Sequence, residues 1–172
     1  LKALGDGGLL RAVARELEGE GFRIVGIDDV LSDCLAVAGP HGQVVPDDQA
    51  QADIQRGHQV AKGIGALDVG QAVIVQQGIV LGVEAIEGTD ALIRRCGELR
   101  RDGPGGVLVK VKKPGQDRRL DLPTIGTATV QEAARAGLRG IAVEAGGALV
   151  LGRDAVAAEA DRLNIFVIGI PC

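Results

Sequence analysis

The chain has 172 residues, enough for one domain, or one domain with an appendage, and for a sizeable hydrophobic core. Its net charge is −4, and its only aromatic residues are two phenylalanines. The acidic balance argues against a general nucleic-acid-binding surface, and the scarcity of aromatic side chains argues against stacking on single-stranded bases. The core must therefore be built from Val, Ile, Leu and Ala.

Cysteine usage favours a reducing compartment. Cys34, Cys96 and Cys172 lie far apart and form no C-x-x-C pair, so we expect a cytoplasmic location. No apolar run approaches the roughly 18 residues of a membrane-spanning helix. The chain begins at Leu1 and contains no methionine, so we expect it to be a fragment that lacks an N-terminal part.

Residues 1–46 are predicted to form a helix, a short strand and an irregular connection. An apolar stripe from Leu9 to Leu17 predicts a helix over residues 7–20. The apolar run FRIVGI predicts a strand over residues 22–27. Residues 28–46 have no clear period and predict a long, partly irregular connection.

Residues 47–172 are predicted to form the main α/β domain. Asp47 and Asp48 open a helix that runs to about residue 65, because acids are favourable at a helix N-terminus. Residues 72–85 predict a β-hairpin that turns at Gln77-Gly78. The next helix is predicted over residues 90–100, with Thr89 or Gly88 as its cap.

The second half of this domain continues the alternation of strands and helices. A capping box, Thr129 to Glu132, predicts a helix that ends at residue 137. Residues 140–151 predict a second hairpin, Asp154 begins the last helix, and residues 165–170 predict a buried strand. We therefore predict a single α/β domain with a mixed β-sheet, helices packed on it and two β-hairpins.

The most informative stretch is KVKKPGQDRRLDLPTIGTAT, residues 110–129. Its first residues continue an alternating pattern from Val107, which predicts a strand with Lys110 and Lys112 on one face. From residue 110 to residue 119, five cations stand against one acid, and Asp121 follows. Cations beside a carboxylate suit a phosphorylated ligand, with the carboxylate left for a metal ion or an attacking water. The alternative is a solvated edge strand protected by lysines.

A second group of acids lies near a predicted helix start. Glu84, Glu87 and Asp90 are spaced three apart around a strand end, a Gly-Thr turn and the beginning of a helix. The free N–H groups of a helix N-terminus favour phosphate, and nearby carboxylates suit Mg²⁺ shared with that phosphate. Ordinary helix capping is the alternative. Glu144, at a later strand end, is a further candidate, or else a surface residue of the second hairpin.

Other well-known catalytic patterns are not supported. His41 and His58 are the only histidines and Ser32 is the only serine, which argues against a Ser-His-Asp relay and against a histidine-rich metal site. The glycines follow neither the dinucleotide-binding pattern nor the P-loop pattern.

Residues 65–95 and 112–146 resemble the C-terminal domain of the LpxI-type UDP-2,3-diacylglucosamine pyrophosphatases. The matching cores are EGTDA (residues 87–91), KP-x-Q (113–116) and DLPTIG (121–126). The resemblance extends from about residue 7 to residue 169 and is loose before Pro46. It implies a Mg²⁺-dependent enzyme of lipid A synthesis in Gram-negative bacteria, which hydrolyses UDP-2,3-diacylglucosamine to UMP and 2,3-diacylglucosamine 1-phosphate.

The same resemblance implies partners and site residues. It implies a homodimer at the cytoplasmic side of the inner membrane, with peripheral membrane contact, and an N-terminal domain, absent here, that holds the lipid product against this one. It also implies that Asp121 is needed for catalysis. Together with the charge pattern, it leads us to expect substrate contacts from Lys110, Lys113, Gln116, Arg119, Thr124, Gly88 and Thr89. The expected Mg²⁺ ligands are Asp121, Glu84, Glu87 and Asp90.

Two other classes of function stay open from the sequence. The chain lacks a self-sufficient catalytic constellation, so it suits a non-catalytic binding module for an acylated sugar phosphate or a nucleotide. A structural dimerisation domain is the remaining possibility.

Overall fold

The computed structural model describes residues 6–171, so Cys172 lies outside the described residues. The helices and the short 3-10 turn, in chain order, are α1 (Asp6–Gly19), α2 (Ile27–Val30), η1 (Ser32–Cys34), α3 (Asp48–Ala66), α4 (Thr89–Glu98), α5 (Thr127–Arg135) and α6 (Arg153–Arg162). The strands are β1 (Gly39–Pro40), β2 (Ala72–Gln76), β3 (Ile79–Val83), β4 (Val107–Lys110), β5 (Thr124–Ile125), β6 (Gly140–Glu144), β7 (Leu149–Val150) and β8 (Phe166–Ile170).

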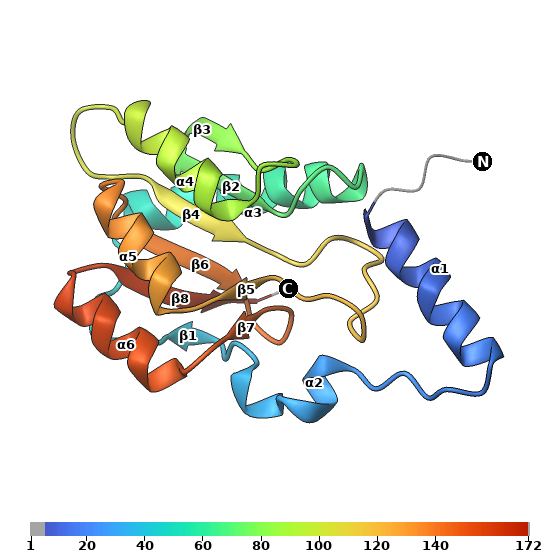
Figure 1. The fold of residues 1–172 in the computed structure, drawn as a ribbon. Coiled ribbons are helices and arrows are strands. Elements are labelled where there is room, and N and C mark those ends of the chain that lie inside the picture. Colours follow the sequence, from blue (N-terminus) through green and yellow to red (C-terminus); the bar gives the residue numbers. More distant parts are fainter. Residues whose placement is uncertain (1–5, 172) are drawn as a thin grey trace.

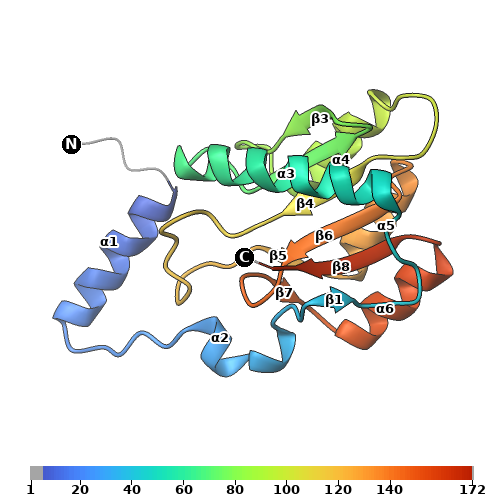
Figure 2. The same ribbon diagram turned by 180° about the vertical axis from the view of Figure 1, so that it is seen from behind.

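A mixed six-stranded sheet with the order β1-β8-β6-β4-β2-β3 lies at the centre (Figure 1). Strands β4, β6 and β8 are parallel, whereas β2, β3 and β1 join by antiparallel pairing. Helices α4, α5 and α6 cover one face, and α3 covers the other, as Figure 2 shows from behind. The prediction of an α/β domain with a mixed sheet is confirmed.

Strand β4 is a central strand and not an edge strand. It pairs with β2 on one side and with β6 on the other. Its alternating side chains enter two different cores: Val107 and Val109 pack on the α3 side, and Leu108 packs on the opposite side. The predicted alternation is confirmed, and the alternative of a solvated edge strand is wrong because both neighbouring positions in the sheet are filled.

The first predicted hairpin forms, and the second does not. Strands β2 and β3 pair through a turn in which Gln77 and Gly78 have φ values of 53° and 77°, the left-handed region such tight turns require. After β6 the chain turns away, and β7 pairs in parallel with β5. Both sides of β6 are already paired, with β4 and β8, so a returning strand has no free edge. Glu144 is consequently fully buried and is not a hairpin surface residue.

The N-terminal segment lies beside the domain. Helix α1 is confirmed, but residues 22–27 form no strand; they lead into α2 as an irregular, extended connection (Figure 1). Phe22 is 63% exposed and Val25 is 48% exposed, and within residues 6–171 no strand pairs with this segment. The irregular connection predicted over residues 28–46 is confirmed in outline, with the two-residue β1 within it.

The other helices begin near their predicted starts. Asp47 caps α3, where its carboxylate accepts a hydrogen bond from the Ala50 N–H at 2.8 Å. Helix α5 begins two residues before Thr129, whose hydroxyl accepts from the Gly126 N–H at 3.4 Å. Within the described part of the chain, no helix has the length and apolar character needed to cross a membrane.

Candidate active site

The predicted site residues gather at the edge of the sheet where the parallel strands end. In open α/β sheets this carboxyl edge is the usual place for ligands. Because β2 runs antiparallel to β4, its first residue, Ala72, pairs with Lys110 at the end of β4. On the other side of β2, the Glu84 N–H donates to the Ala72 carbonyl at 2.8 Å. The sheet therefore brings together residues from three separate parts of the sequence.

Two adjoining pockets lie at this edge. The first has a volume of about 360 Å³, and the predicted residues in its wall are Glu84, Gly88, Lys113, Gln116 and Asp121. The second has a volume of about 380 Å³, and the predicted residues in its wall are Glu87, Gly88, Thr89, Asp90, Lys110 and Thr124. Gly88 lines both pockets, so the start of α4 separates them.

Lys110 joins the motifs. Its side chain is nearly buried, with 9% exposure, and Nζ donates a hydrogen bond to the Thr124 carbonyl at 3.0 Å. Burial lowers the pKa of Lys110, and the nearby carboxylates of Glu84, Asp121 and Asp90 oppose that shift. The ammonium is thus held between EGTDA and DLPTIG, although these motifs lie some thirty residues apart.

Asp121 is oriented by the KP-x-Q motif. The Gln116 amide nitrogen donates to Asp121 Oδ2 at 2.8 Å, and the Gln116 amide oxygen accepts from the Lys113 N–H at 2.9 Å. One glutamine therefore fixes the loop and the carboxylate together. Asp121 itself is exposed, so its carboxylate is accessible to a ligand.

Glu84 supports the start of α4. Its Oε1 accepts from the Thr89 hydroxyl at 2.6 Å, and its Oε2 accepts from the Gln71 N–H at 3.0 Å. Gly88 is the N-cap of helix α4; its φ of 79° favours glycine, and it provides no side-chain cap. Of the two predicted caps, Gly88 is therefore correct. Thr89 is the first helical residue, and its hydroxyl is bound to Glu84.

The four predicted metal ligands are divided between the two pockets. Glu84 and Asp121 line the first, whereas Glu87 and Asp90 line the second. The Glu87 carboxylate accepts a hydrogen bond from Arg95 at 2.7 Å. The pKa of Glu87 is lowered, chiefly by a hydrogen bond from its own backbone N–H and next by the Arg95 guanidinium. Within residues 6–171, no group of three or more His, Cys, Asp and Glu side chains lies close enough together to hold a metal ion.

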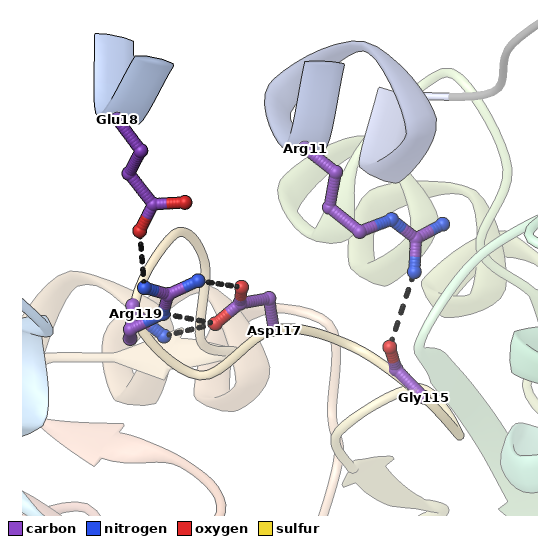
Figure 3. A network of polar contacts seen from close by, with 5 residues as sticks. All are labelled: Arg11, Glu18, Gly115, Asp117 and Arg119. Carbon is purple, nitrogen blue, oxygen red and sulfur yellow. Dashed lines mark hydrogen bonds and ion pairs between the residues drawn. The ribbon is translucent and has the colours of Figure 1, made fainter. Parts of the chain in front are cut away.

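Arg119 is paired with two acids, one of which, Asp117, lines the first pocket (Figure 3). Its guanidinium contacts Glu18 of α1 at 2.7 Å and Asp117 of its own loop at 2.8 Å. The guanidinium of Arg119 lowers the pKa of Asp117. A second arginine, Arg11 of α1, donates to the Gly115 carbonyl at 3.2 Å. Of the predicted substrate residues, Arg119 is the one that the described walls of these two pockets do not include.

Several wall residues were not predicted. Arg11 and Gln71 line the first pocket, and Arg94 and Thr129 line the second. Arg94 follows Asp90 by four residues, a helical spacing that points it to the same side as the EGTDA motif. For Arg11 the sequence offers no comparable signal, because only the tertiary fold brings α1 to residues 113–121.

Comparisons with known proteins identify the family of the chain. A family model described as the LpxI C-terminal domain matches residues 37–168, which include all three motifs. The chain is also 49% identical over 172 aligned residues to UDP-2,3-diacylglucosamine pyrophosphatase LpxI of Caulobacter vibrioides. That match covers 96% of the chain and 61% of the relative, so the chain spans less than two thirds of the relative's length. The chain belongs to the LpxI family, and residues 37–168 correspond to its C-terminal domain.

Proposed function

We propose that the chain is the C-terminal part of an enzyme that hydrolyses the pyrophosphate of UDP-2,3-diacylglucosamine. The products would be UMP and 2,3-diacylglucosamine 1-phosphate, a step of lipid A synthesis. The observation that carries this proposal is the meeting of EGTDA, KP-x-Q and DLPTIG around two adjoining pockets, with Lys110 between them. The name and 49% identity of the Caulobacter relative support the same reaction.

Each motif has a role that its position supports. Lys110 and Lys113 would neutralise phosphate oxygens, and the N-terminus of α4 at Gly88 would receive another. Asp121 would orient the attacking water, because its carboxylate is exposed and the hydrogen bond from Gln116 holds it in place. Arg119 would contact substrate only after leaving Glu18 and Asp117.

The charge of the first pocket supports a role for Mg²⁺. Four carboxylates and two cations line it: Asp68, Glu84, Asp117 and Asp121, with Arg11 and Lys113. A pyrophosphate entering this pocket would meet excess negative charge. The donors fit an ion held by one or two carboxylates and shared with substrate phosphates, which is how Mg²⁺ is commonly bound. Asp121 and Glu84 would hold it, and the ion would neutralise charge on the phosphates.

Replacement of Asp121 by asparagine tests the proposal. The protein should carry this chain together with the N-terminal domain of the family, and UMP release should be followed with Mg²⁺ present. We expect kcat to fall by about 10²-fold or more, because the amide neither accepts a proton nor binds a cation well. The melting temperature should hardly change, because Asp121 is exposed.

Asp102→Asn is the matched control, since Asp102 is an exposed acid in a loop outside both pockets. Wild-type turnover by the Asp121 variant would remove Asp121 from the mechanism.

The chain alone should be assayed beside that longer protein. UMP release by the longer protein only would mean that the site is completed by the N-terminal domain. Calorimetry of the chain with UMP and with the lipid product, with and without Mg²⁺, then tests the binding-module alternative, which the division of the carboxylates between two pockets favours. No heat with either ligand would argue against that alternative.

The proposed partners follow from the same family. Exposed apolar side chains between Leu9 and Leu31 suit cover by the N-terminal domain. We further propose a homodimer in the cytoplasm with peripheral contact to the inner membrane. Light scattering tests the dimer, and sedimentation with anionic vesicles tests the membrane contact.

A further inference from the structure

An ion pair between a buried glutamate and a partly exposed lysine holds the backbone just beyond the end of β4. Lys62, on α3, contacts Glu144, at the end of β6, with 2.5 Å between Nζ and Oε2. The same ammonium donates to the Lys112 carbonyl at 3.1 Å, and the same carboxylate oxygen accepts from the Lys112 N–H at 3.0 Å. Both backbone groups of one residue are thus held by side chains of opposite charge.

These two side-chain hydrogen bonds to the Lys112 backbone take the place of backbone pairing beyond the end of the strand. Val111 makes the last backbone bond of this strand to the neighbouring segment, from its N–H to the Gln71 carbonyl at 3.0 Å. Lys112 is the next residue, and buried backbone groups there need other partners. The Glu144 side chain is 1% exposed and is packed against Gly147, where an added Cβ would lie 2.8 Å from its Cδ. Its carboxylate is therefore confined to the position that the Lys112 N–H needs.

Beyond Lys112, consecutive contacts lead to Asp121. The Lys113 N–H donates to the Gln116 amide oxygen, and the Gln116 amide nitrogen donates to Asp121. We propose that the Lys62–Glu144 pair is a positioning device that sets the loop of residues 112–121 at the first pocket, and so places Gln116 and Asp121. Its effect on catalysis rests on the proposed function; its effect on the loop does not.

Four variants test the pair. Glu144→Gln removes one charge at constant shape, Lys62→Met removes the other, and the double variant removes both charges of the pair together. Lys62→Arg retains a cation and donors for both acceptors. Arg162→Gln is the matched control, because Arg162 pairs with Glu159 on α6, away from the pockets.

Amide hydrogen exchange on the 172-residue chain is the first measurement. We expect exchange at Lys112 and Lys113 to accelerate by at least about 10-fold in Glu144→Gln and in the double variant, with β6 and α3 unchanged. The Gln116 side-chain amide signals should shift in the same variants. Unchanged exchange over residues 112–121, or a uniform acceleration throughout the chain, would overturn the proposal. The double variant decides the question if Lys62→Met fails to fold.

UMP release by the protein with its N-terminal domain is the second measurement. We expect kcat to fall by about 10- to 100-fold in Glu144→Gln, the usual loss for residues that orient a catalytic group. KM should change less than about threefold, because uniform substrate binding is retained. Lys62→Arg should recover most of the activity that Lys62→Met loses. A wild-type kcat in Glu144→Gln would overturn the catalytic effect. An inactive wild type would instead refute the proposed function, and hydrogen exchange would still decide the positioning effect.

Discussion

At the scale of single residues, Lys110 is a cation buried at the end of a central strand. A lysine at a central strand end is 9% exposed, and burial lowers its pKa from an ordinary value of 10.5. Folding therefore disfavours its charged form. That cost is present near neutral pH and disappears as pH rises through the lowered pKa toward the ordinary one. Such a cost is typical of functional sites.

Lys110→Met separates function from stability. We expect turnover of the proposed reaction to fall at least about 10-fold, because the cation proposed to neutralise phosphate oxygens is lost. The free energy of unfolding in urea at pH 7 should stay within about 1 kcal/mol of wild type. The variant no longer buries a charged ammonium, and this gain offsets the lost hydrogen bond to the Thr124 carbonyl. As pH rises toward 10.5, wild type should gain stability relative to the variant.

Arg56→Met, at an exposed position of α3, serves as the control. A stability loss above about 3 kcal/mol in Lys110→Met would show that Lys110 mainly holds the fold together.

At the scale of elements, the contact of α3 with the sheet depends on a glycine. A Cβ added at Gly57 would lie 2.5 Å from Cγ2 of Val109 on β4, closer than real side chains approach. The helix lies this close to β4 only because Gly57 has no side chain. At Gly63, which is exposed on the same helix, an added Cβ would meet nothing within 4 Å.

Two alanine substitutions in α3 should therefore have opposite effects. Gly57→Ala should lower the free energy of unfolding by about 1–3 kcal/mol, because it overpacks the core against Val109. Gly63→Ala should raise it by about 0.5–1 kcal/mol, because alanine loses less backbone entropy on folding to a helix. Urea unfolding of both variants measures the difference. Equal effects would show that the helix can move away from the sheet without cost.

At the scale of the whole molecule, polar contacts join α1 to the loop of residues 112–121. Leu9, Val13 and Leu17 are 58%, 50% and 39% exposed, and Ala14 is the one buried residue among the described side chains of this helix. Two of the polar contacts with this loop are those of Arg119 with Glu18 and of Arg11 with the Gly115 carbonyl (Figure 3). Exposed ion pairs contribute little and weaken with salt.

Arg119→Ala should release α1 without loosening the sheet. We expect amide exchange over residues 6–19 to accelerate severalfold, and the free energy of unfolding of the domain to change by less than about 1 kcal/mol. High salt should produce the same acceleration in wild type. Arg162→Ala, which breaks another exposed pair, is the control. Unchanged exchange in α1 would mean that other contacts hold the helix.

Local signals were sufficient for much of the fold. Acids at Asp47 and Asp48 identified the start of α3, and Gln77-Gly78 identified the first hairpin, because helix caps and tight turns depend on neighbouring residues. The strand at residues 22–27 and the second hairpin were predicted wrongly. Both have the composition of strands, but strand pairing depends on a free edge elsewhere in the fold.

The sequence by itself determined the α/β class, most of the helices, the family and the three motifs that carry the candidate site. Only the tertiary structure decided that β4 is central, that Lys110 and Glu144 are buried, and that Arg119 pairs with α1. It also divided the four candidate metal ligands between two pockets. The physical reason is range: caps, turns and periodicity act within a few residues, whereas burial and charge pairing depend on groups that the chain brings together from far apart.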